Sequence, residues 1–120
     1  NIKAYKEEYP KKKVCMIFQP HRFSRTAQLF DDFVKVLNKT DSLILLDIYS
    51  ASEKPIRGIH SRTIAESIKQ LGHKDVTYLK NHKDVINLIN QKKDSFDILV
   101  TQGAGSVSKV CESIKDKWKI

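Results

Sequence analysis

The sequence lacks the features that mark membrane-spanning and secreted proteins. No apolar run approaches the roughly 20 residues of a membrane-spanning helix, and the first nine residues contain no apolar signal region. Only two cysteines occur, Cys15 and Cys111, and they do not form a CxxC pair. Isolated thiols of this kind are typical of reduced cysteines in the cytoplasm. We therefore expect a cytoplasmic protein that binds no membrane, with both cysteines serving in packing.

The signature motifs of common catalytic sites are missing as well. The sequence has no GxxxxGK[ST] phosphate loop, no GxSxG nucleophile elbow and no Cys–His motif of a known type. His60, His73 and His82 show no spacing of the kind found in metal-binding pairs. We therefore expect this chain to hold no metal and no cofactor, and to contain no catalytic residue of its own.

Acidic residues are fewer than lysines and arginines, which gives the chain a formal net charge of +8. Such an excess is compatible with a nucleic-acid-binding module. The lysines are scattered, however, and neither a basic stripe on one helix nor an aromatic ladder accompanies them. This distribution favours a solvated lysine-rich surface. We expect no nucleic-acid partner, and keep a basic nucleic-acid-binding α/β module as the alternative.

Strand and helix patterns alternate along the chain. We expect strands at 13–19, 42–49, 75–79 and 96–101, and helices at 26–38, at 61–71, from 81 or 82 onward, and at 107–117. Strict alternation is typical of a parallel sheet with helices on both faces, and right-handed crossovers leave few strand orders. The prediction is one α/β domain over 1–120. Its fold is three-layered, doubly wound and Rossmann-like, with about four mainly parallel strands in the order 3-2-1-4.

The stretch between the first strand and the first helix has the densest chemistry. One imidazole and two guanidiniums, those of His21, Arg22 and Arg25, fall within five residues. Arginine binds a carboxylate or phosphate through two parallel hydrogen bonds, and a helix start adds partial positive charge. We therefore predict a receptor for a small anion, with Arg22 and Arg25 as the clamp and His21 as a hydrogen-bond donor. Solvated loop charge is the alternative.

A glycine turn at 102–106 follows the fourth strand and belongs to the same predicted site. In the order 3-2-1-4 the first and fourth strands are neighbours, and ligands bind beyond their carboxyl ends. Gly103, Ala104 and Gly105 would let the backbone approach a ligand closely, although Ser108 replaces the third glycine of a GxGxxG motif. We expect these residues to line the mouth of the site. A free-standing nucleotide binder that uses this turn is an alternative.

The end of the second strand supplies further polar residues. Tyr49 is a possible lining residue of the same site, since it ends the strand expected beside the first. Asp47 and Glu53 could together suggest acid–base chemistry. Neither a partner base nor a metal-ligand set accompanies them, so we interpret both carboxylates as groups that order the loop.

Four segments of the sequence resemble one known family. They are FQPHRFSRT at 18–26, FDDF at 30–33, LDIYSASEKPI at 46–56 and QGAGSV at 102–107. In this order and spacing they resemble the C-terminal domain of the Mur ligases, most closely the branch that joins L-alanine to UDP-N-acetylmuramate. The sequence departs from the family at Arg57, where a small or apolar residue is usual. The equivalent domain of the related murein tripeptide ligase shares part of the pattern and is an alternative.

The resemblance implies one domain of a larger, cytoplasmic, ATP-dependent ligase of peptidoglycan precursor synthesis. In that family an N-terminal domain holds the UDP-sugar, and a central domain holds ATP and magnesium. The C-terminal domain closes over the site, positions the amino acid and is inactive alone. By the same resemblance, His21, Arg22 and Arg25 match positions that contact the amino-acid end of the ligand. The implied partners are the two other domains, L-alanine and UDP-N-acetylmuramate.

Overall fold

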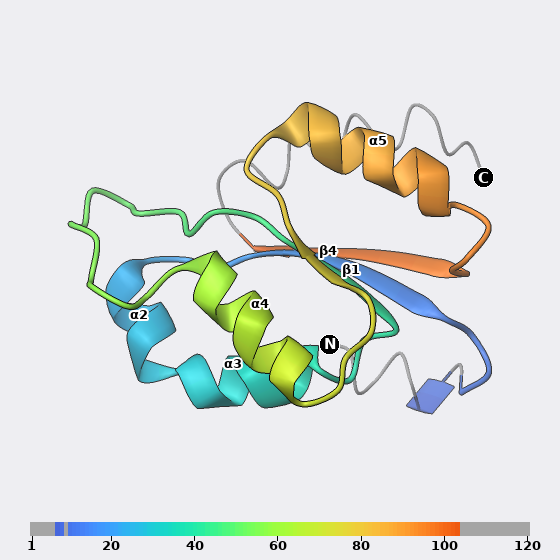
Figure 1. Ribbon diagram of the computed structural model, residues 1–120, viewed down its shortest axis with the longest axis horizontal. Coiled ribbons are helices and arrows are strands. Elements are labelled where there is room, and N and C mark those ends of the chain that lie inside the picture. Colours follow the sequence, from blue (N-terminus) through green and yellow to red (C-terminus); the bar gives the residue numbers. More distant parts are fainter. Residues whose placement is uncertain (1–6, 9, 104–120) are drawn as a thin grey trace.

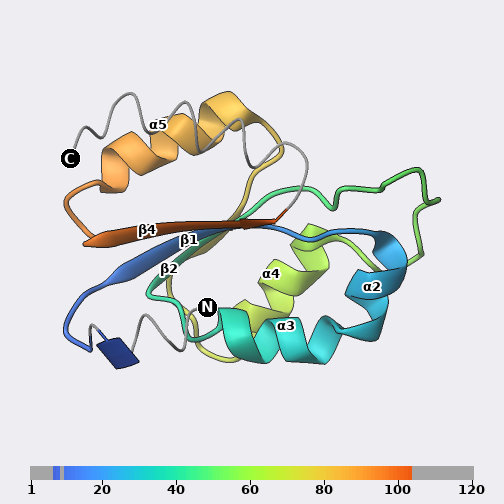
Figure 2. The same ribbon diagram turned by 180° about the vertical axis from the view of Figure 1, so that it is seen from behind.

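The computed structural model describes residues 7–8 and 10–103, and a four-stranded parallel sheet lies at its centre. The strands are β1 (Val14–Gln19), β2 (Ser42–Leu45), β3 (Val76–Tyr78) and β4 (Ile98–Gly103), and the helices are α2 (Phe23–Gln28), α3 (Phe30–Leu37), α4 (Ser61–Gln70) and α5 (His82–Lys92). The strand order is β3-β2-β1-β4. Helices α2, α3 and α4 lie on one side of the sheet and α5 on the other (Figures 1 and 2). The predicted three-layer, Rossmann-like α/β fold with strand order 3-2-1-4 is confirmed.

The central strand β1 is buried along its whole length, which explains its continuous apolar run. Alternate side chains point to opposite faces of the sheet. Met16 and Phe18 therefore pack in the cluster formed with α3 and α4, whereas Cys15 and Ile17 pack in the cluster formed with α5. Each fully buried aliphatic side chain contributes about 1.5–3 kcal/mol, so these two clusters hold the three layers together.

Cys15 is a packing residue of the α5-side cluster, as predicted. Its side chain is fully buried, and this burial raises the pKa of the thiol to about 11. The thiol is therefore neutral at physiological pH and unreactive as a nucleophile. Cys111, the second cysteine, lies outside the described residues.

The first predicted helix is wrong in its start and its continuity. The sequence predicts a single helix over 26–38, whereas the structure has α2 beginning at Phe23 and α3 beginning at Phe30. The early start follows from Arg22, because its carbonyl already accepts the first helical hydrogen bond, from the N–H of Thr26. The break follows from Leu29, whose φ of −105° and ψ of 14° lie outside the helical region.

Two predicted strand ends are also displaced. The strand predicted to end at residue 49 ends at Leu45, because Pro20 follows the neighbouring β1 and has no N–H with which to continue the ladder. The two segments still run side by side, since Tyr49 donates its N–H to the carbonyl of Pro20 at 2.9 Å. At the other side of β1, β4 continues to Gly103, so the first two residues of the predicted glycine turn belong to the strand.

The other described helix ends agree closely with the predictions. His60 caps the start of α4, and Gly72 follows its end with a φ of +99°, a left-handed stop that suits glycine. Asn81 caps α5 by accepting a backbone N–H at 2.9 Å. The helix predicted at 107–117 lies outside the described residues. Within the described part of the chain, no helix combines the length and the apolarity that crossing a membrane requires.

Candidate anion-binding site

The three residues predicted to bind an anion lie together beyond the carboxyl end of β1. His21 and Arg22 connect the strand to α2, and Arg25 lies within that helix. With Ser24 and Gln28 they line one open depression of about 350 Å³, which we call the cationic pocket. In Figure 1 the segment that carries these residues lies at the left, where β1 leads into α2. Both arginine residues are exposed, so an anion can reach them from solvent.

Arg22 has a backbone conformation that is rare for a residue with a side chain. Its φ is +68° and its ψ is 142°, and such a conformation costs on the order of 1–3 kcal/mol. Hydrogen bonds hold the residue at both ends. Its N–H donates to the carbonyl of Tyr49 at 2.7 Å, and its carbonyl accepts the N–H and the hydroxyl of Thr26 at 3.1 and 2.7 Å. The surrounding structure therefore imposes this conformation on Arg22.

His21 lies against Tyr49, where the chain leaves β1 and β2. The two rings are stacked, with their centroids 5.5 Å apart and their planes within 9°, and the two backbones form a parallel bridge. The side chain of Tyr49 does not line the depression itself. It supports the imidazole that does, and with 43% of its area exposed it extends the surface beside the pocket.

Gly103 brings the end of β4 to the same edge of the sheet. It pairs with Gln19, the last residue of β1. A Cβ atom at this position would lie 2.4 Å from the carbonyl oxygen of Gln19, and the φ of +135° also disfavours a side chain. Only glycine allows this close approach. Ala104 and Gly105, the other two predicted lining residues of the turn, lie outside the described residues.

Both carboxylates that the sequence predicts to order the loop after β2 do so. Glu53 accepts hydrogen bonds from the N–H and the hydroxyl of Ser24, at 3.0 and 2.6 Å. These bonds favour the ionised form and hold the pKa of Glu53 below its usual value. Asp47 accepts a hydrogen bond from the hydroxyl of Tyr78 in β3. The sequence pattern indicates the role of the carboxylates but not the identity of their donors.

Tyr78 lies at the centre of a cluster of polar side chains that the sequence analysis does not single out. The ring of His60 meets it edge-on at 5.1 Å, and the Arg62 guanidinium lies 5.6 Å from its centre. His60 Nε2 is 3.8 Å from Asp47 Oδ1. Burial and the bond to Asp47 raise the pKa of Tyr78 to about 12, so it remains a hydroxyl donor at neutral pH. The predicted strand order could have indicated this cluster, because it places Tyr78 beside Leu45 at the end of β2, two residues before Asp47.

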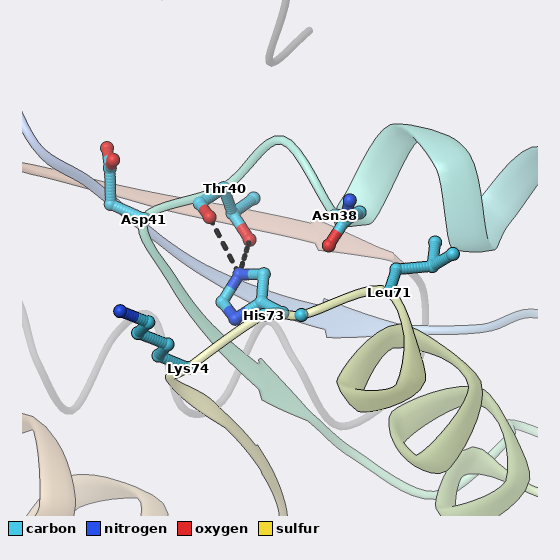
Figure 3. Close-up of a pocket in the computed structure, with 7 residues that line it drawn as sticks. Asn38, Thr40, Asp41, Leu71, His73 and Lys74 are labelled. Carbon is cyan, nitrogen blue, oxygen red and sulfur yellow. Dashed lines mark hydrogen bonds between the residues drawn. The ribbon is translucent and has the colours of Figure 1, made fainter.

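A second depression, of about 330 Å³, lies at the opposite, amino end of the sheet (Figure 3). His73 occupies it between the turns that precede β2 and β3. Its Nδ1 accepts the N–H of Asp75 at 3.0 Å, so the ring proton is on Nε2, which donates to the carbonyl of Thr40 at 2.7 Å. Both nitrogens are engaged within the protein, and we interpret His73 as a structural link between the two turns.

Metal-ligating side chains do not gather in the described part of the chain. Within residues 7–8 and 10–103, no three His, Cys, Asp or Glu side chains form a group that could hold a metal ion. The three histidines outside the pocket lie apart: His60 caps α4, His73 lies in the turn before β3, and His82 begins α5. No protein-family model matches the chain. A functional interpretation therefore depends on the cationic pocket and on the sequence segment that builds it.

Proposed function

We propose that this chain is the C-terminal domain of a Mur ligase, of the branch that joins L-alanine to UDP-N-acetylmuramate in peptidoglycan precursor synthesis. The observation that supports the proposal most strongly is the convergence of His21, Arg22 and Arg25 around one depression beyond the central strand. This edge is where parallel α/β sheets bind ligands. The strained backbone of Arg22 adds support, because strain of this size persists mainly at functional positions.

The role proposed for the cationic pocket is to hold the carboxylate of the incoming amino acid. Arg22 and Arg25 each offer a planar fork of N–H donors, which suits the two oxygens of a carboxylate. His21 supplies a further ring N–H donor. With the carboxylate held, the amine of the same small molecule points away from the pocket, toward the group that it attacks. Fixing this orientation is a large source of rate enhancement in reactions between two substrates.

ATP and Mg²⁺ belong, in this proposal, to the rest of the ligase. The residues of this chain do not fit either group, since the sequence has no GxxxxGK[ST] loop and the described residues include no metal-ligand cluster. The part of this chain is to bind and orient the amino acid and to exclude water when the domain closes. The chain alone is then inactive, its partners are the N-terminal and central domains, and its location is the cytoplasm.

Kinetics of the ligase that contains this chain test the proposal. Phosphate release would be measured with ATP, Mg²⁺, UDP-N-acetylmuramate and L-alanine. Hydrogen bonds to charged groups contribute about 1.5–3 kcal/mol each, so Arg22→Ala and Arg25→Ala should each lower kcat/KM for L-alanine roughly 10- to 100-fold. Lys35→Ala is the matched control, because it removes one exposed positive charge from α3. Absence of L-alanine ligation, or unchanged kinetics in both arginine variants, would overturn the proposal.

A further inference from the structure

Residues 49–53, which follow β2, are hydrogen-bonded at two points to residues 20–24, the segment that carries His21 and Arg22. At the first, Tyr49 donates its N–H to the carbonyl of Pro20 and accepts the N–H of Arg22 at its own carbonyl, at 2.9 and 2.7 Å. At the second, the carboxylate of Glu53 accepts the N–H and the hydroxyl of Ser24. The strained Arg22 takes part in the first attachment and precedes the second by two residues. Residues 49–53 therefore run along residues 20–24 and restrain them at two points.

The turn that presents Glu53 is itself strained. Ala51 and Ser52 both have left-handed backbone conformations, with φ of +50° and +71°. Glu53 closes this turn by donating its N–H to the carbonyl of Ser50 at 3.0 Å. A left-handed conformation costs an L-residue roughly 1–2 kcal/mol, and neither residue is glycine. The chain therefore tolerates two unfavourable residues in a row, directly before the carboxylate that reaches Ser24.

The negative charge of Glu53 complements the positive charge of the nearby arginines. Arg22 and Arg25 concentrate positive charge around one depression, and mutual repulsion opposes holding such groups close together. The two hydrogen bonds from Ser24 keep the pKa of Glu53 low, and the positive charge of Arg22 adds a smaller contribution in the same direction. Glu53 is thus ionised throughout the neutral range, and its charge offsets part of that repulsion without its side chain lining the pocket.

We infer that Glu53 is a positioning residue for the cationic pocket: by bridging to Ser24 it fixes the segment on which His21 and Arg22 are presented to a carboxylate ligand. The inference rests on the proposed function and deepens it, because it names the residue that sets the geometry of the amino-acid clamp. Glu53 itself does not touch the substrate. It acts through the backbone of 20–24, and its bond to Ser24 resists displacement of Arg22 when a ligand arrives.

The test compares Glu53→Ala with Glu53→Gln in the ligase that contains this chain. A glutamine keeps the bridge, since its carbonyl can accept the Ser24 N–H and its amide can donate to the Ser24 hydroxyl. We expect Glu53→Ala to raise the KM for L-alanine about tenfold with kcat within twofold, and Glu53→Gln to raise it less than threefold. Glu66→Ala, which removes an exposed glutamate from α4, is the matched control and should leave both constants unchanged.

A second measurement separates this inference from the proposed function. In NMR spectra of the 120-residue chain, Glu53→Ala should shift the Ser24 and Arg22 amide resonances and speed their hydrogen exchange, whereas Glu53→Gln should preserve most of the exchange protection. If Glu53→Ala fails to fold, Ser24→Ala removes one of the two bridging bonds and should give an intermediate effect. A wild-type ligase that does not use L-alanine would overturn the proposed function alone. Unchanged Ser24 and Arg22 amides, or equal losses in the alanine and glutamine variants, would overturn the role of Glu53.

Discussion

The imidazole of His21 is stacked in parallel with the phenol ring of Tyr49, with the planes 9° apart and the centroids separated by 5.5 Å. The two residues follow the neighbouring strands β1 and β2, and their backbones form an isolated parallel bridge. The phenol ring therefore covers part of one face of the imidazole, which limits how the imidazole can rotate. An imidazole that must donate a hydrogen bond to a ligand benefits from this restraint, because less conformational entropy is lost on binding.

Removal of the Tyr49 ring should release His21. A stacked aromatic pair contributes about 0.5–1.5 kcal/mol beyond its buried area, so Tyr49→Ala, which also removes the buried part of the ring, should destabilise the chain by more than that amount. The His21 ring proton resonances should move downfield as the ring-current shift from Tyr49 disappears. Tyr49→Phe keeps the ring and serves as the control for both readouts. Proton NMR and urea unfolding are the measurements. His21 resonances that do not move in Tyr49→Ala would contradict the stacked arrangement in solution.

Substitution of Arg22 by glycine should separate stability from function. Relief of the φ of +68° recovers on the order of 1–3 kcal/mol, and the extra flexibility of glycine in the unfolded chain costs about 0.5–1 kcal/mol. We expect Arg22→Gly to raise the free energy of unfolding by about 1 kcal/mol, measured in urea. Activity of the ligase should fall as in Arg22→Ala, which keeps the Cβ and gains no such stability. An Arg22→Gly chain that is less stable than Arg22→Ala would show that the backbone at this position is not strained.

The fold was open to prediction from the sequence because it depends on patterns that are local. The apolar run of β1, the 3.6-residue stripe of the helices and the alternation of the two leave few arrangements. The strained backbone of Arg22 could not be predicted in this way. Arginine has no preference for a φ of +68°, and the conformation exists because Tyr49, 27 positions away, accepts the Arg22 N–H. The break at Leu29 is likewise absent from the apolar pattern, which continues across it.

In the candidate site, too, features that are local in sequence could be predicted, whereas contacts between distant residues could not. The cluster of His21, Arg22 and Arg25 could be found because the three lie within five residues. The bond between Glu53 and Ser24 joins residues 29 positions apart, and the bond between Tyr78 and Asp47 joins residues 31 apart. Pairs of that kind depend on strand register and on loop conformation. A sequence can indicate that a carboxylate orders a loop, but its donor is known only when the loop is placed.

Gly103 should tolerate no side chain. In Gly103→Ala the added Cβ would meet the carbonyl oxygen of Gln19 at 2.4 Å, so either β4 or the end of β1 must shift. With the cost of the positive φ added, we expect a loss of about 2–4 kcal/mol in the free energy of unfolding. Gly72→Ala is the control, because its φ is also positive but no atom lies within 4 Å of the added group; about 1 kcal/mol should be lost there. Equal losses in the two variants, measured by urea unfolding, would argue against the close pairing of β1 and β4.

Stability should depend on pH through Asp75 at the amino end of the sheet, where its carboxylate accepts hydrogen bonds from the ammonium group of Lys92 and from the hydroxyl of Ser42. Partial burial alone would raise the pKa of Asp75, but these bonds outweigh it and the pKa lies below its usual value. A carboxyl group whose pKa is lower in the folded state contributes stability above its unfolded pKa of about 4, and loses it as the pH falls toward the folded value.

The contribution of the Asp75 pair should be about 1 kcal/mol at pH 7, because the carboxylate is more than one-third exposed and solvent screens it. Asp75→Asn should lower the free energy of unfolding by that amount at pH 7 and by less at pH 3, where the wild-type carboxyl group is increasingly protonated. Asp94→Asn, which changes an exposed aspartate beyond the end of α5, should follow the wild-type profile. Urea unfolding between pH 3 and pH 7 measures all three chains. An Asp75→Asn curve parallel to that of the wild type would mean that the pair with Lys92 does not form in solution, since only a group with a lowered folded-state pKa makes the two curves converge in acid.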